Sequence, residues 1–313
     1  MRVFVAGGTG AVGRHLIPAL VADGHQVTAS TRSPGKSADL AAAGAVPVVM
    51  DGLDRNAVLA AVQRAAPEVI VNEMTSLGAT KDFRRFDEEF AVTNDLRTRG
   101  TDHLLEAARL TGSRRFIAQS FTGFTNAYAG SLVKTEDDPL NPDPPASARH
   151  AMAAIRHVDE TVPGGAPEGI VLRYGLFYGH GASNGTLGAV RAGKFPVIGG
   201  GTGIWSFCEI TDAASATRAA VTRGAPGLYN IVDDEPAPAA EWVPFLASCL
   251  GAPAPQEIPA SLGHEVAGEY LTAQMTVGRG SSNAKAKREL GWAPRYASWR
   301  EGFPEWAASA GRA

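Results

Sequence analysis

Short runs of β-branched and other apolar residues alternate with longer helical patterns through the first half of the chain. The runs that we expect to form strands span residues 2–6, 26–31, 45–50, 68–73 and 114–120. Strands separated by helix-length segments are typical of βαβ units, whose strands are parallel and buried on both faces. The pattern therefore predicts an α/β fold with a doubly wound parallel sheet.

The helical patterns of this half are expected to begin near Gly10, Asp54 and Asp82. Asp54 precedes an amphipathic run, where an N-cap carboxylate accepts hydrogen bonds from free backbone N–H groups. Pro18 lies inside the first helical pattern. Because proline lacks an N–H, we expect it to cost that helix a backbone hydrogen bond or to introduce a kink.

The second half of the chain is more irregular and richer in glycine. We expect a proline-rich loop at residues 137–148, followed by a helix and then a strand at 169–177. A glycine-rich loop at 199–205, a second strand at 228–234 and a further helix at 240–250 are expected next. Turn-forming residues crowd the segments between them. This distribution suggests a smaller lobe set over one edge of the sheet.

Composition narrows the class of protein. The chain has 313 residues, 44% of them hydrophobic, and a net charge of -3 from 29 basic and 32 acidic side chains. That length and balance predict a soluble globular protein without the basic field that nucleic acid or an anionic membrane requires. We therefore expect a small-molecule partner.

Two cysteines, Cys208 and Cys249, are far apart and match no metal-ligand spacing, so neither a disulfide framework nor a metal site is expected. No apolar run reaches the roughly eighteen residues that a membrane helix needs. A signal peptide is not expected either, because the first strand leads at once into a glycine turn. These features predict a cytoplasmic enzyme.

The first strand is followed by a glycine-rich turn with the spacing GxxGxxG, formed by Gly7, Gly10 and Gly13. Glycines permit a tight turn and let a diphosphate approach the backbone N–H groups at the positive end of the next helix. Strand, turn, helix and second strand together are strong evidence for dinucleotide binding. The predicted contacts of this turn are Gly7, Thr9, Gly10, Ala11, Val12 and Gly13.

The end of the second strand indicates which dinucleotide is bound. Enzymes that use NAD usually hold the ribose 2′-hydroxyl there with a carboxylate, but residues 24–38 contain no Asp or Glu. Arg32, Ser33 and Lys36 follow the strand instead and suit a 2′-phosphate. We therefore predict NADP(H), with NAD the alternative. Asp51, at the tip of the third strand, is predicted to accept from the adenine amino group.

Several segments together resemble the extended short-chain dehydrogenase/reductase family, also called the NAD-dependent epimerase/dehydratase family. They are "GGTGAVG", "GTDHLLEAA", "RRFIAQSF", "VLRYGLFYG", "SFCEITDAASA" and "SNAKAKRELGWAPRY". The resemblance implies a Rossmann-like NADP-binding domain over residues 1–168, whose sheet strands near 169–177 and 228–234 also join. It implies a substrate-binding lobe over 178–313, and a homodimer formed through long helices at 82–111 and 147–162.

The resemblance also implies which residues lie along the rest of the cofactor. Segments after the third and fourth strands and a tyrosine in the "LRYG" motif correspond to family positions near the adenine and nicotinamide ends. In this sequence the corresponding residues are Asp51, Gly52, Leu53, Met74, Thr75 and Tyr174.

Members of that family use a Tyr and a Lys spaced YxxxK, in which the tyrosine transfers the substrate's hydroxyl proton and the lysine lowers its pKa. This chain has no such pair. The matching positions hold Ala151 with Ile155 or, in the next register, Met152 with Arg156. Arg97 stands where the family often has an asparagine. The sequence therefore departs from the family's usual acid/base chemistry.

Three residues are the candidates for replacing the missing pair. Ser120 and Thr122, after the fifth strand, are predicted to donate hydrogen bonds to a substrate carbonyl. His150, at the start of the helix that normally carries the tyrosine, is the leading proton donor, with a surface or capping role as the alternative. Glu73 and Glu209 offer a further acid/base pair, or each pairs with an arginine such as Arg97.

The first functional hypothesis is an NADP(H)-dependent oxidoreductase that reduces a small carbonyl or an activated alkene with a non-standard acid/base arrangement. The second is a non-redox isomerase, cyclase or lyase that uses Glu73, His150 and Glu209. The third is a regulator that senses NADP(H) without turnover. The polar residues around the fifth strand favour the first hypothesis.

Overall fold

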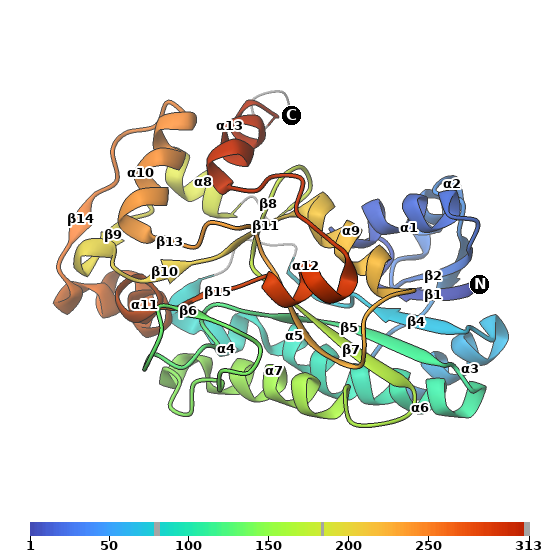
Figure 1. Ribbon diagram of the computed structural model, residues 1–313. Coiled ribbons are helices and arrows are strands. Elements are labelled where there is room, and N and C mark those ends of the chain that lie inside the picture. Colours follow the sequence, from blue (N-terminus) through green and yellow to red (C-terminus); the bar gives the residue numbers. More distant parts are fainter. Residues whose placement is uncertain (78–81, 183–184, 310–313) are drawn as a thin grey trace.

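Seven parallel strands form the central sheet of the computed structural model, in the order β12-β7-β5-β4-β1-β2-β3 (Figure 1). The structure describes residues 1–77, 82–182 and 185–309. The strands are β1 Arg2–Ala6, β2 Gln26–Thr31, β3 Val46–Val49, β4 Val69–Asn72, β5 Arg115–Phe121, β7 Glu168–Tyr174 and β12 Gly227–Ile231. The predicted α/β class with a doubly wound parallel sheet is confirmed.

Helices cover both faces of the sheet, as the apolar strands require. One face packs against α1 Gly13–Ala22, α2 Ser37–Ala42, α9 Ile210–Ala220 and α12 Ala284–Leu290. The other face packs against α3 Arg55–Ala65, α6 Thr101–Thr111 and α7 Arg149–Thr161. Asp54 is the N-cap of α3, as predicted, because its Oδ1 accepts from Ala57 N at 3.1 Å.

The first helix begins at Gly13, three residues later than expected, so Gly10, Ala11 and Val12 belong to the turn. Pro18 lies inside this helix. Its side chain is on the exposed side of α1. The carbonyl of Arg14, which loses its donor to the proline, can therefore be solvated rather than buried.

The long helix expected over residues 82–111 is broken into five pieces. They are the 3-10 turn η2 Phe83–Arg85, α4 Phe86–Glu89, α5 Ala91–Asp95, the π-helical turn η3 Leu96–Gly100, and α6. The helix expected over 147–162 is α7, which is preceded by the 3-10 turn η4 Ala146–Ala148. Single π-helical turns inserted in helices occur frequently at functional sites.

Beyond Tyr174 the chain leaves the main sheet and builds short two-stranded pairs. The strand expected over 169–177 ends at Tyr174, and Leu176–Tyr178 (β8) pairs with β11 Phe207–Glu209 instead. The loop expected over 199–205 contains the 3-10 turn η5 Gly199–Gly201 and a short strand, β10 Ile204–Trp205. The other short strands are β6 Val133–Lys134, β9 Val197–Ile198, β13 Ala237–Pro238, β14 Glu257–Ile258 and β15 Gly280–Ser281.

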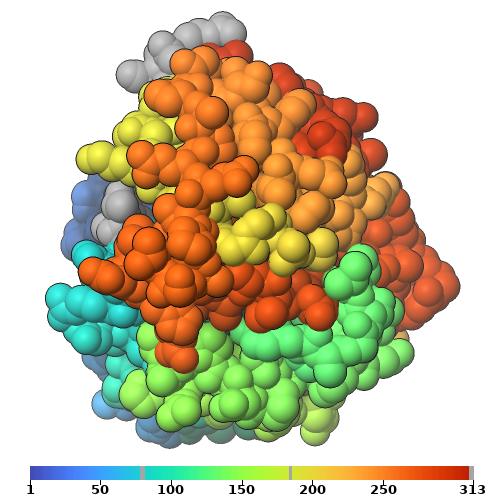
Figure 2. Space-filling view, turned by 90° about the vertical axis from the view of Figure 1, so that its left-hand side faces the viewer, coloured from blue at the N-terminus to red at the C-terminus, as the bar shows by residue number. Residues whose placement is uncertain are grey.

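The remaining helices gather beyond one end of the sheet (Figure 1). They are α8 Gly185–Arg191, α10 Ala239–Cys249, α11 Ala260–Val277 and α13 Trp299–Ser309. Their core includes the fully buried rings of Trp242, Trp299 and Phe303. The upper part of the face shown in Figure 2 is formed mainly by these C-terminal segments. No helix among the described residues is long and apolar enough to cross a membrane.

One buried cation joins segments that are far apart in the chain. Arg115, on β5, donates to the backbone carbonyls of Ala220, Arg223 and Gly224, at distances of 2.6–3.1 Å. It also pairs with Glu168 at 2.9 Å. The turn after α9 is thereby fastened to the centre of the sheet.

Candidate functional site

The glycine turn after β1 has no room for side chains at two of its positions. Gly7 has a φ of 87°, and a Cβ there would lie 2.7 Å from the carbonyl oxygen of Glu73. A Cβ on Gly13 would lie 2.5 Å from the carbonyl oxygen of Gly8. Both positions therefore require glycine, because backbone atoms of the turn and of Glu73, just after β4, occupy the space.

The same turn presents backbone donors at the start of α1. Gly10 N donates to Gly7 O at 2.9 Å, whereas the N–H groups of Thr9, Ala11 and Val12 have no acceptor among the described residues. Free N–H groups at a helix N-terminus attract a phosphate. The predicted contacts of this turn thus come together in an arrangement that fits the diphosphate of a dinucleotide.

The residues predicted to recognise the adenosine side lie on the surface next to this turn. Arg32, Ser33 and Lys36 are exposed, and Ser33 N donates to Thr31 Oγ1 at 3.2 Å. Neither cation forms an ion pair with any described residue. Across the turn, Thr31 Oγ1 and Thr9 Oγ1 lie 3.3 Å apart. Two unpaired cations beside the diphosphate site provide a setting for another phosphate.

The segments after β3 and β4 lie close together at the same edge of the sheet. Asp51 is exposed, and its Oδ1 accepts from Leu53 N at 3.0 Å, which leaves its second oxygen open. Gly52 packs against Met74, whose sulfur would collide with any Cβ there. Thr75, next in the chain, is exposed. The structure thus brings together all the residues predicted after these two strands.

Glu73 is a buried carboxyl at the tip of β4, directly below the glycine turn. The Tyr174 hydroxyl donates to its Oε1 at 2.8 Å, and the Thr217 hydroxyl lies 3.5 Å from the same atom. Burial raises the pKa of Glu73 to about 8 although both hydrogen bonds lower it. The group is therefore mainly protonated at neutral pH, and its partners are hydroxyls rather than Arg97.

Replacing this carboxyl by an amide, Glu73→Gln, is expected to make stability less dependent on pH. The folded-state pKa of Glu73 lies above its unfolded value, so the wild type loses stability as pH rises from about 4.5 to about 8. Gln does not titrate. We expect urea unfolding to give equal stabilities near pH 4.5 and a variant more stable by a few kcal/mol at pH 8. A difference in the free energy of unfolding between wild type and variant that stays constant with pH would contradict the raised pKa of Glu73.

The positions of the family's Tyr and Lys are filled by apolar side chains. Ala151 and Ile155 lie fully buried on α7. In the alternative register, Met152 is also buried, and Arg156 donates to the carbonyl of Asn141 at 3.3 Å. Neither register places a phenol or an ammonium group at this point of the helix.

Ser120 belongs to a buried ionic cluster between β5, α7 and β7. Its hydroxyl donates to Asp159 Oδ1 at 2.9 Å. Arg173 holds the other carboxylate oxygen through Nε at 2.8 Å and Nη2 at 2.7 Å. A hydroxyl has one proton, and here Asp159 accepts it. Donation from Ser120 to a substrate carbonyl would therefore require this hydrogen bond to break.

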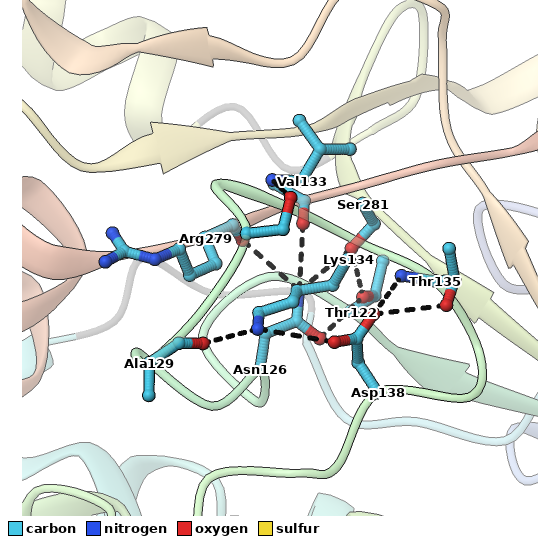
Figure 3. A network of polar contacts seen from close by, with 11 residues as sticks. Thr122, Asn126, Ala129, Val133, Lys134, Thr135, Asp138, Arg279 and Ser281 are labelled. Atoms are coloured by element: carbon cyan, nitrogen blue, oxygen red, sulfur yellow. Dashed lines mark hydrogen bonds and ion pairs between the residues drawn. The ribbon is translucent and has the colours of Figure 1, made fainter.

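Thr122 lies in a second network, which joins the end of β5 to β15 (Figure 3). Its hydroxyl is 2.6 Å from Ser281 Oγ, and Asn126 Nδ2 donates to that same oxygen at 2.9 Å. Close by in this view, Lys134 Nζ donates to Ala129 O at 2.5 Å and pairs with Asp138 at 3.4 Å. Thr122 is buried in this network, an arrangement that suits anchoring.

The other candidate acid/base groups do not meet. His150 is on the surface, with its side chain 86% exposed and its ring Nδ1 3.6 Å from the Asp87 carboxylate. The backbone N–H of His150 donates to the same carboxylate. This placement agrees with the surface alternative. Glu209 is the N-cap of α9, where it accepts from Thr211 N at 2.6 Å and from Asp212 N at 3.3 Å. It forms no ion pair with Arg97 in the described structure.

Two polar residues of the broken helix were not predicted as site residues. Asn94 and Arg97 are both more than nine-tenths buried, and neither the Asn94 amide nor the Arg97 Nε has a hydrogen-bond partner among the described residues. The sequence contained one signal for them, since Arg97 replaces a family asparagine. Its burial depends on the packing of η3 against α7, which no local pattern specifies.

Comparison with known proteins agrees with this geometry. Residues 3–232 match the family described as the NAD dependent epimerase/dehydratase family. A 3-diazoavenalumate denitrifying reductase of Streptomyces sp is 44% identical over 97% of this chain and 99% of its own. A 2-alkyl-3-oxoalkanoate reductase of Stenotrophomonas maltophilia is 27% identical over 81% of this chain and 77% of its own.

Among solved structures, a UDP-glucose 4-epimerase of Thermotoga maritima is similar over 100% of this chain and 99% of its own, with a TM-score of 0.78. The sequence identity is 18%, so this likeness concerns the fold. The Rossmann-like architecture implied by the sequence is thereby confirmed.

Proposed function

Since the chain belongs to the NAD dependent epimerase/dehydratase family, we propose that it is an NADP(H)-dependent reductase whose acceptor needs no proton from a side chain. The two curated relatives described above are reductases, and an NAD(P)-dependent reductase is the general assignment. The single observation that carries the finer proposal is the pair of buried apolar side chains, Ala151 and Ile155, where the family has its acid.

The residues that would hold the cofactor are those of the glycine turn and its surroundings. The free N–H groups of Thr9, Ala11 and Val12 would bind the diphosphate, and Arg32 with Lys36 would bind the 2′-phosphate. When bound, the reduced nicotinamide supplies a hydride. Tyr174 and Glu73 would form a neutral, hydrogen-bonded pair next to the glycine turn.

The class of hydride acceptor follows from the lack of a free side-chain proton donor at the proposed site. A ketone becomes an alkoxide when it takes up hydride, so its reduction gains from a positioned proton donor, typically about a hundredfold or more. The hydroxyls of Ser120 and Thr122 are both engaged within the protein. An acceptor that forms no alkoxide would react without such a donor.

A diazo compound in its protonated, diazonium form meets this requirement. Hydride forms a C–H bond at the carbon that carries the nitrogen, the C–N bond breaks, and its electron pair leaves with dinitrogen. The products are the reduced carbon compound, dinitrogen and oxidised cofactor, so no oxygen is protonated. The name of the 44% identical relative, a diazo-acid denitrifying reductase, supports this acceptor class. An activated alkene whose carbanion takes a proton from water is the related alternative.

The test follows deuterium from 4-deuterated NADPH into product with a panel of diazonium salts, enones and ketones. We expect NADPH oxidation, deuterium on carbon and dinitrogen release with the diazonium compounds, slower reaction with enones and little with ketones. Ketone reduction at comparable rates would contradict the acceptor proposal. No oxidation with any acceptor, combined with unequal affinities for NADPH and NADP⁺, would favour a cofactor-sensing regulator instead.

A further inference from the structure

Arg97 is a buried cation that forms no ion pair with any residue that the structure describes. Its side chain lies on η3, and the residue is 6% exposed. It makes no hydrogen bond with any residue in the ranges that the structure describes, and its Nε is enclosed without an acceptor. Burial lowers the pKa of this guanidinium to about 10, which leaves it charged at neutral pH. A buried charge is costly unless an opposite charge compensates it.

Asp159, the carboxylate that interacts electrostatically with Arg97, does not provide that compensation. Asp159 attracts Arg97 electrostatically, but both of its oxygens are already bonded, one by Ser120 and the other by Arg173. Two guanidinium groups thus share one carboxylate, and only Arg173 makes the ion pair. One positive charge in this cluster has no counter-ion in the described structure.

A second unpaired group lies one helical turn away. Asn94 is 8% exposed, and neither its amide nitrogen nor its amide oxygen has a partner among the residues described. Asn94 lies near the end of α5, and Arg97 follows three residues later on η3, so the two unpaired groups belong to one continuous segment. Buried polar side chains are nearly always hydrogen-bonded, so these two residues hold donors and an acceptor that are available to a ligand.

These residues lie near the carboxyl end of β4. Asn72, the last residue of β4, donates to Thr101 Oγ1 at 3.1 Å, which sets α6 and η3 against the carboxyl end of that strand. Ser76 N donates to Thr93 Oγ1 at 3.0 Å, so the segment after β4 passes beside α5. Ligands of open parallel sheets bind at the carboxyl ends of the strands. Asn94 and Arg97 lie near that edge, on α5 and η3, which both pack against α7.

We propose that Arg97 and Asn94 form a subsite for the carboxylate of the substrate. A carboxylate supplies the negative charge that Arg97 lacks and accepts paired N–H groups from a guanidinium. The Asn94 amide can donate to the same group. Sugar hydroxyls of a cofactor are neutral and would leave the charge uncompensated. The inference rests on the proposed function, and it narrows the substrate class to acids.

The test uses cinnamate as a conjugated carboxylate and cinnamamide as its uncharged analogue. Binding is measured by calorimetry on the protein saturated with NADP⁺. We expect cinnamate to bind wild type at least tenfold more tightly than cinnamamide, and Arg97→Gln to weaken cinnamate about 10- to 100-fold with cinnamamide unchanged. Arg99→Gln, an exposed position on the same turn, is the matched control and should bind cinnamate like the wild type.

The ligand-free protein gives a second readout that a purely structural arginine would not produce. If Arg97 binds an anion, Arg97→Met removes an uncompensated charge and should raise the thermal unfolding temperature of the ligand-free protein. The stabilisation by cinnamate should be lost in the same variant. A fall in that temperature would overturn the proposal. Equal affinity for acid and amide, no binding of either, or weaker NADP⁺ binding in Arg97→Gln would also overturn it. Failure of the proposed function is seen separately, as absence of hydride transfer from bound NADPH.

Discussion

Replacing Arg32 and Lys36 together by alanine is expected to weaken the binding of NADPH about 100-fold and to leave the affinity for NADH within twofold. Both cations are exposed beside the glycine turn, and neither forms an ion pair with a residue in the described ranges. Each would contribute a charge-assisted hydrogen bond to the 2′-phosphate, which at an exposed site is worth about tenfold in affinity. Fluorescence titration with NADPH and with NADH measures the ratio of the two affinities directly.

The matched control is Arg64→Ala, which removes an exposed arginine from α3. It should leave both affinities unchanged. The difference between NADPH and NADH should shrink as salt rises, because exposed charges are screened. Equal weakening of the two cofactors would show that the pair supports the turn rather than reading the phosphate, and the assignment would return to NAD(P).

Loss of the buried carboxylate, in Asp159→Asn, is expected to destabilise the protein by about 3–5 kcal/mol. Asp159 compensates the charge of the buried Arg173 and accepts a hydrogen bond from the Ser120 hydroxyl. Removing one partner of a buried ion pair leaves an uncompensated charge, which is the costly case. Urea unfolding at pH 7 gives the difference in the free energy of unfolding.

Asp102→Asn is a control with the same chemical change at a surface pair. Asp102 lies 2.8 Å from His157 Nε2, with half of its side chain exposed, and such pairs contribute at most about 1 kcal/mol. A similar loss of stability in both variants would contradict the special position of Asp159. Addition of cinnamate should not restore Asp159→Asn, since the proposed ligand sits on Arg97 rather than on Arg173.

Local patterns were sufficient to predict the sheet, the cap at Asp54 and the glycine turn. Each depends on residues that are near in sequence, such as the alternation of strands with amphipathic segments. The positions of Gly7 and Gly13 follow from steric requirements that a sequence displays directly. The absence of the Tyr/Lys pair was equally visible, because it is a matter of residue identity.

The electrostatic pairing could not be predicted in the same way. Glu73 was expected to act as a base or to pair with an arginine, and it instead accepts from a tyrosine 101 positions away. Ser120 was expected to face a substrate, but its hydroxyl donates a hydrogen bond to a carboxylate on α7. The breaks within residues 82–111 depend on tertiary contacts of α5 and η3 with α7. Long-range contacts of this kind decide which polar groups remain free.

The bonds of Arg115 have a consequence for synthesis on the ribosome. This arginine is made 105 to 109 residues before the carbonyl groups that it donates to. Until β7 and those residues emerge, β5 is the edge strand of the nascent sheet, and water can solvate the Arg115 guanidinium. The bonds of Arg115 therefore form only after the segment following α9 has been translated.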